Sequence, residues 1–210
     1  MSRTATISRK TNETQIEIAL DLDGGAYEHR TGVGFFDHML DHVGKHGRLG
    51  LTVSCTGDTH VDDHHTVEDV GIALGQAINE AIGDKRGIER YGFASVPMED
   101  ALAQVTLDLS GRPALVYRVQ FTDASGEPTD APTAIPGGAM TGATGAFDLQ
   151  LVREFFNAVV NNAGMNLHVV VPHGLNNHHI VEGIFKAFGR ALRQAVAITH
   201  DEVPSTKGTL

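Results

Sequence analysis

The motif His-His-x-x-Glu occurs twice in the chain, at residues 64–68 and again at residues 178–182. On a helix, residues four apart share a face, so the first histidine and the glutamate of each motif project together. The second histidine points about 100° away around the same helix. Imidazole and carboxylate groups together are ligands for divalent Mn, Fe, Co, Ni or Zn. The motifs therefore predict metal binding by His64, His65, Glu68, His178, His179 and Glu182.

One more residue that can bind a metal precedes each motif, His38 before the first and Glu154 before the second. We expect two pseudo-equivalent metal sites, each with ligands from both halves of the chain. One site would take His38, His65, His178 and Glu182, and the other would take His64, Glu68, Glu154 and His179. An exchange of His65 with His64 between these sites is left open. A single motif is also compatible with a polar helix start, but two matching copies favour a ligand role.

Two further histidines follow His38 at intervals of four residues, namely His42 and His46. All three would line one face of a helix. We expect His42 to be an exposed polar residue. His46 stands near the helix end, where it either reaches a bound ligand or interacts favourably with the C-terminal end of the helix dipole.

Alternation and helical spacing predict the elements that position these residues. In the first half we expect a strand at 5–9, a hairpin of strands 14–22 and 27–31, a helix from 34 to about 47, a strand at 49–55, a polar loop at 57–63 and a helix at 64–82. In the second half we expect a hairpin of strands 101–109 and 114–121, a surface loop at 122–145, a helix at 147–163, a strand at 166–171 and a helix at 177–197.

The order helix, strand, polar loop, helix occurs in both halves, and both second helices begin with the same motif. An internal repeat of this kind fixes the architecture. We therefore predict an α+β fold built as a tandem pseudo-twofold repeat of a unit of strands plus two helices. The whole chain, 1–210, would be a single domain of two halves, about 1–95 and 96–210.

Composition narrows the class of protein. The formal net charge of −10 excludes strong non-specific binding to nucleic acid. No apolar run approaches the roughly 20 residues that cross a membrane. The first ten residues are polar and lack the apolar region of a signal peptide. A single cysteine, Cys55, excludes a disulfide framework and favours a cytoplasmic location.

Several ordered motifs give the chain a family resemblance. They are Thr11-Asn12-Glu13-Thr14, 34–40 (GFFDHML), Gly57-Asp58, 62–69 (DDHHTVED), 108–113 (DLSGRP), 177–182 (NHHIVE) with 185–188 (FKAF), and 204–208 (PSTKG). With these motifs the sequence resembles imidazoleglycerol-phosphate dehydratase of histidine biosynthesis, in its monofunctional form, over nearly the whole chain. The resemblance implies a fold like that of ribosomal protein S5 domain 2. The sequence departs from the family pattern at Glu154, where many members of the family carry histidine.

The resemblance implies a lyase that removes water from imidazole glycerol phosphate and gives imidazole acetol phosphate. Two Mn²⁺ ions per subunit, or other divalent transition metals, would stabilise the substrate imidazolate. Glu13 would be the acid/base group, and Asp108 or a ligand carboxylate would hold a water that assists departure of hydroxide. The substrate would be bound by Glu13, His46, Arg90, Arg112, Lys186, Ser205 and Lys207. The family also implies a homo-oligomer of 24 subunits with sites completed by neighbouring chains.

Two other functions remain open at this stage. A dinuclear metal-dependent hydrolase would use the same ligands to generate hydroxide, and release of phosphate would reveal it. A non-enzymatic metal-binding shell would bind metal without turnover and would leave Glu13 and Arg112 without a role. An S5-like nucleic-acid module agrees with the fold but not with the acidic charge.

Overall fold

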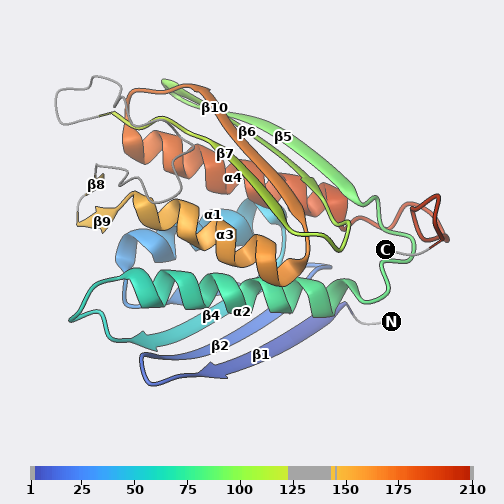
Figure 1. Cartoon of the computed structure of the whole chain (residues 1–210), viewed down its shortest axis with the longest axis horizontal. Helices are drawn as coiled ribbons and strands as arrows, with labels where there is room; N and C mark the ends of the chain where they lie inside the picture. Colours follow the sequence, from blue (N-terminus) through green and yellow to red (C-terminus); the bar gives the residue numbers. More distant parts are fainter. Residues whose placement is uncertain (1–2, 123–142, 145, 209–210) are drawn as a thin grey trace.

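The computed structural model describes residues 3–122, 143–144 and 146–208. Two four-stranded sheets lie on the outside of the molecule, and the helices lie between them (Figure 1). The first repeat consists of β1 (Thr4–Lys10), β2 (Thr14–Asp21), β3 (Tyr27–Arg30), α1 (Gly34–Gly47), β4 (Gly50–Gly57) and α2 (His64–Ile82). The second consists of β5 (Tyr91–Met98), β6 (Ala101–Asp108), β7 (Ala114–Arg118), α3 (Gln150–Ala163), β10 (Asn166–His173) and α4 (Asn177–Ala195).

The two sheets have the same topology. Their strand orders are β1-β2-β4-β3 and β5-β6-β10-β7. In each sheet the first three strands are antiparallel, and the fourth pairs in parallel with the third. This repetition confirms the α+β tandem repeat that the sequence predicts.

The helices exchange partners between the two repeats. Helix α1 of the first repeat packs against α4 of the second, and α3 of the second packs against α2 of the first. Both contacts are close. A Cβ on Gly189 of α4 would lie 2.9 Å from the Val43 carbonyl oxygen of α1, and one on Gly71 of α2 would lie 2.8 Å from the Phe155 carbonyl oxygen of α3. The exchange brings residues of both repeats together at each helix pair.

Sequence periodicity explains which faces form the core. In β2, alternate residues Ile16, Ile18 and Leu20 are buried, as expected for a strand with one face on the core. In α2 and α4 the buried residues recur at helical spacing. Between the helices, Phe155 and Phe156 of α3 lie in ring contact with residues of α4, so aromatic packing joins the two.

Both expected hairpins at the third strands are wrong. Strand β3 pairs in parallel with β4 and not with β2, and β7 pairs in parallel with β10 and not with β6. The reason is that β4 and β10 occupy the edges of β2 and β6 with which a hairpin strand would pair. Strands β3 and β7 therefore pair with the outer edges of β4 and β10, and α1 and α3 provide the crossovers that parallel pairing requires.

Other differences are smaller. Residues Phe147–Asp148 form the short strand β9, paired with β8 (Ala143–Thr144), so α3 begins at Gln150 and not at Phe147. Strand β5 was not among the expected elements, since Gly92 and Pro97 weaken its pattern. Helix α4 ends at Ala195, two residues earlier than expected. Most of the expected loop at 122–145 lies outside the described residues.

Candidate functional site

A group of possible metal ligands lies where α1 meets α4. One ligand atom from each of His38, His178 and Glu182 lies within 4.8 Å of the others. The Glu182 carboxylate is 3.0 Å from Nε2 of His178 and 3.4 Å from Nε2 of His38. A fourth side chain, His42, has its Nε2 3.5 Å from the same carboxylate. We call these four residues the α1/α4 group.

The charge state of the α1/α4 group suits a divalent cation. Burial opposes the ionisation of Glu182, but a hydrogen bond from Lys186 and the nearby charges of His42 and Lys186 lower its pKa to about 2. Burial is the main reason that the pKa of His42 falls to about 4, with smaller effects from neighbouring cations. At neutral pH the group therefore offers a carboxylate and a neutral imidazole. Lys186 Nζ lies 2.5 Å from that carboxylate.

Local sequence explains how α4 presents its ligands. Asn176 precedes the helix, and its side chain accepts hydrogen bonds from the backbone N–H groups of His178 and His179. This N-cap starts the helix immediately before the motif. The spacing of four residues then places His178 and Glu182 on one face, which α1 covers.

A matching group lies where α2 meets α3. His64 and Glu68 of α2 are 3.7 Å apart at the same spacing. Glu154 of α3 lines a cavity of about 380 Å³ together with His64. Because His38 and Glu154 are each the fifth residue of their helix, these three residues correspond in position to His38, His178 and Glu182. We call His64, Glu68 and Glu154 the α2/α3 group. Among the described residues, only the α1/α4 set has its ligand atoms within 4.8 Å of one another.

The second histidine of each motif lies outside these groups in the described part of the chain. His65 faces Asp58, with Nδ1 at 3.1 Å, and Glu13, with Nε2 at 3.8 Å. His179 faces Asp100, with Nδ1 at 2.5 Å, and Glu99, with Nε2 at 3.9 Å. The expected grouping of His65 with His38, and of His179 with His64, is thus not formed within one chain.

Carboxylates hold both of these imidazoles. The hydrogen bond that His65 donates to the Asp58 carboxylate raises the pKa of His65. The hydrogen bond with His179, with further ones from the backbone N–H groups of Asn176 and Leu175, holds the pKa of Asp100 well below its ordinary value. A carboxylate on Nδ1 fixes the orientation of the ring and leaves Nε2 to bind a metal. Neither aspartate was among the residues expected from the sequence.

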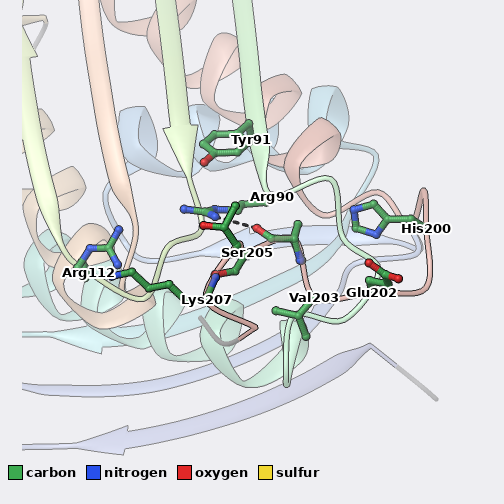
Figure 2. Close-up of a pocket in the computed structure, with 10 residues that line it drawn as sticks. Arg90, Tyr91, Arg112, His200, Glu202, Val203, Ser205 and Lys207 are labelled. Carbon is green, nitrogen blue, oxygen red and sulfur yellow. Dashed lines mark hydrogen bonds between the residues drawn. The ribbon is translucent and has the colours of Figure 1, made fainter.

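The expected phosphate-binding residues lie together in a different place. Arg90, Arg112, Ser205 and Lys207 line one cavity of about 650 Å³, which we call the cationic cavity (Figure 2). The cavity lies beyond the C-terminal end of α4, since the Arg90 N–H donates to the carbonyl of Ala195. Asp108 accepts hydrogen bonds from Arg90 at 2.6 Å and 3.0 Å. It therefore lies with the cationic cavity and not with the α1/α4 group.

His46 lines a third cavity, of about 460 Å³, together with Arg48, Arg190 and Arg193. Burial and the positive charges of Lys186 and Arg190 lower its pKa. His42, which the sequence led us to expect in an exposed position, is instead mostly buried beside Glu182. The spacing of four residues from His38 was the signal that would have identified it.

None of the helices in the described part of the chain combines the length and apolar character that a membrane crossing needs. The fold and these groups define an α+β protein of two repeated units, in which imidazole and carboxylate side chains near the helix N-termini could hold a metal ion.

Comparisons with known proteins give the family. Residues 31–192 match the family described as imidazoleglycerol-phosphate dehydratase. The imidazoleglycerol-phosphate dehydratase of Ruegeria pomeroyi is 54% identical over 212 residues, which cover 99% of this chain and 100% of the relative. That of Ralstonia pickettii is 52% identical over 214 residues, which cover all of both chains.

Solved structures agree. The dehydratase of Staphylococcus aureus has a TM-score of 0.78 at 37% identity, covering 93% of this chain and 99% of its own. The structure of IGPD from Pyrococcus furiosus in complex with (S)-C348 has a TM-score of 0.80 at 32% identity, and the match covers 97% of this chain and 100% of that chain. The chain belongs to the imidazoleglycerol-phosphate dehydratase family. It is an enzyme, a carbon–oxygen hydro-lyase of histidine biosynthesis.

Proposed function

We propose that this dehydratase acts on imidazole glycerol phosphate with two divalent metal ions per subunit, and that these are Mn²⁺. The observation that carries the proposal is the mirrored pair of histidine–carboxylate groups, one at α1/α4 and one at α2/α3. Their donors are nitrogen and oxygen atoms, which suit Mn²⁺. When bound, two such cations stabilise negative charge on the imidazole ring of the substrate.

We assign the acid/base role to Glu13. Its carboxylate is half-exposed and lies 3.8 Å from Nε2 of His65, so it can reach a substrate bound beside that imidazole. The substrate loses one hydrogen from carbon as a proton and one hydroxide from the neighbouring carbon, which together make one water. Glu13 takes the proton from carbon, and the enol that remains becomes the ketone by proton transfer.

The substrate phosphate would bind in the cationic cavity, because planar arginine groups match phosphate oxygens in pairs. Arg90, Arg112, Ser205 and Lys207 provide these contacts. In place of the water-holding role expected from the sequence, we propose that Asp108 positions Arg90. Nearer the metal groups, Lys186 and His46 would contact the substrate from α4 and α1.

Distance within one chain supports an oligomer. The α1/α4 group lies in the first turns of α4, and Arg90 lies against its last residue, Ala195. A helix of 19 residues is roughly 28 Å long, which a small phosphorylated substrate does not span. We therefore propose that neighbouring subunits complete each site, in a homo-oligomer of 24 chains. The exposed rings of Tyr91 and Phe93 on β5 are suited to such contacts.

We further propose that residues 1–210 act as one dehydratase domain made of two halves that divide near residue 95. The single cysteine suits the reducing cytoplasm, where we place the enzyme.

The test is metal content and turnover on one sample. The protein is stripped with chelator, Mn²⁺ is added back, and formation of imidazole acetol phosphate from imidazole glycerol phosphate is followed. We expect activity to return at about two metals per subunit, and to be lost in Glu13→Gln with metal still bound. Metal uptake without ketone would contradict the proposal and favour a metal-binding shell. Release of inorganic phosphate would favour the hydrolase.

A further inference from the structure

The two mirrored metal groups differ in the ligand at one pair of equivalent positions. His38 is the fifth residue of α1, and its counterpart, the fifth residue of α3, is Glu154. His178 and Glu182 of α4 correspond in type to His64 and Glu68 of α2. The repeat therefore exchanges an imidazole for a carboxylate between its two copies. His42, the fourth member of the α1/α4 group, has no counterpart in the α2/α3 group.

The surroundings of the α1/α4 group add nitrogen and positive charge. The His42 ring lies edge-on to the His38 ring, with centroids 4.5 Å apart and planes at 65°, and its Nε2 approaches the Glu182 carboxylate. Lys186 Nζ lies 2.5 Å from that carboxylate and offsets its charge. Glu182 itself is 6% exposed. The side chains of His38 and His178 are 47% and 40% exposed, so of these three ligands only the carboxylate is sheltered from water. This group is thus rich in imidazole and close to neutral.

The surroundings of the α2/α3 group have the opposite character. The cavity that holds His64 and Glu154 is also lined by Asp62, Asp63 and Asp148. Among the described residues that line it, there is no lysine or arginine. His64 and Glu68 are each nearly half-exposed. Two of the three histidines of the α1/α4 group are exposed to a similar extent, so the difference lies in charge. The α2/α3 group is rich in carboxylate and strongly negative.

Because one group is rich in imidazole and the other in carboxylate, the two groups should prefer different metals. Carboxylate oxygens suit hard cations such as Mn²⁺ and Mg²⁺, whereas imidazole nitrogens suit borderline cations such as Co²⁺, Ni²⁺ and Zn²⁺. If neighbouring subunits complete the groups with His65 and His179, each gains the same type of ligand, and the contrast remains.

We propose that the two metal sites of this enzyme are inequivalent: the α2/α3 group is selective for a hard cation, and the α1/α4 group for a borderline one. The basis is the exchange of His38 for Glu154 together with the opposite charge of their surroundings. The inference rests on the proposed two-metal function. It identifies Glu154 as the residue that determines the preference of its site.

The experiment compares Mn²⁺ with Co²⁺ as probes, on the full-length protein stripped of metal. Each metal is titrated separately by calorimetry, and bound Mn²⁺ is also followed by electron paramagnetic resonance. For wild type we expect two classes of site, whose ratios of Mn²⁺ to Co²⁺ affinity differ by about tenfold or more, since changes even to the hydrogen-bond partners of ligands alter metal affinity by about 10- to 100-fold. A single class with one ratio would overturn the inference.

Two reciprocal substitutions, one in each group, show which class of site belongs to which group. Glu154→His should shift the harder class towards Co²⁺, and His38→Glu should shift the other class towards Mn²⁺. The matched control is Glu80→His, an exposed position at the far end of α2, which should leave both ratios unchanged. Two classes that neither variant alters would overturn the inference while leaving the proposed function intact. Failure of wild type to bind either metal would instead overturn the proposed function.

Discussion

The carboxylate of Asp108 accepts two hydrogen bonds from the guanidinium of Arg90, at 2.6 Å from Nε and 3.0 Å from Nη2. Nη1 of the same arginine donates to the carbonyl of Pro204 at 2.8 Å. The bonds to Asp108 raise the pKa of Arg90 and hold its plane. Arg90 is thus fixed in one orientation at the edge of the cationic cavity.

This pair predicts the kinetic effect of Asp108→Asn. An amide keeps the shape but loses the charge and one acceptor, so Arg90 is released from its orientation. Loss of a charged hydrogen bond costs about 1.5–3 kcal/mol, and we expect KM for imidazole glycerol phosphate to rise by roughly 10- to 100-fold, with kcat little changed. Steady-state kinetics beside the exposed control Asp84→Asn measure it. A collapse of kcat at unchanged KM would instead place Asp108 in the chemistry.

Asp100 predicts a different effect, on metal affinity. Its hydrogen bond to Nδ1 of His179 orients the ring, and removal of such partners of metal-binding histidines lowers affinity by about 10- to 100-fold. We expect Asp100→Asn to weaken Mn²⁺ binding by this factor, and Asp58→Asn to do the same through His65. Titration of metal-free protein gives the dissociation constants. Because Asp100 also accepts from the Leu175 N–H, a thermal melt must show that the variant is folded. Unchanged affinity in a folded variant would contradict the orienting role.

The sequence predicted the elements with clear periodicity and missed pairings that depend on distant contacts. The alternation in β2 and the helical spacing in α2 identified both elements, and the repeated motif identified the tandem architecture. The turn signals at 23–25 and 110–113 are typical of hairpins, yet neither leads to one. The partner of β3 and β7 is decided by β4 and β10, which come much later in the chain.

In the candidate site, too, local spacing was predicted and contacts between distant residues were missed. The spacing within each motif was sufficient to pair His178 with Glu182 and His64 with Glu68. The spacing of four residues placed His42 on the same helix face as His38, but its burial was not predicted, because that burial results from the packing of α1 on a helix of the other repeat. Asp100 was likewise missed, since nothing in its local sequence shows that it lies beside His179.

Close helix packing predicts the effect of Gly71→Ala. The added Cβ would lie 2.8 Å from the Phe155 carbonyl oxygen and 2.9 Å from the Ala158 Cβ. We expect a loss of about 1–3 kcal/mol in the free energy of unfolding from overpacking, although alanine is intrinsically the better helix residue by about 1 kcal/mol. In thermal melts each kcal/mol corresponds to roughly 2–4 °C. Gly34→Ala is the matched control, since its Cβ would meet nothing within 4 Å. Equal melting temperatures for the two variants would refute the packing argument.

Cys55 in β4 gives a prediction for stability against pH. The side chain is buried, with 8% of the residue exposed. Burial is the main cause that raises the pKa of its thiol from 9.0 to about 11, and the nearby charges of Asp69 and Asp37 add to it. The thiolate is the nucleophilic form of cysteine. The folded protein should therefore react slowly with alkylating reagents at pH 8.

The sign of the pH effect follows from linkage. The folded state holds the thiol proton more tightly than the unfolded state does, so the stabilisation is complete below pH 9 and is lost as the pH rises through 11. A shift of two pKa units corresponds to a loss on the order of 2–3 kcal/mol. Because tyrosines and lysines titrate in the same range, the observable is the difference between wild type and Cys55→Ala. Denaturant unfolding at pH 8 and pH 11 measures it, and we expect wild type to lose more stability than the variant. Equal losses in both proteins would show that the Cys55 thiol titrates normally in the folded state.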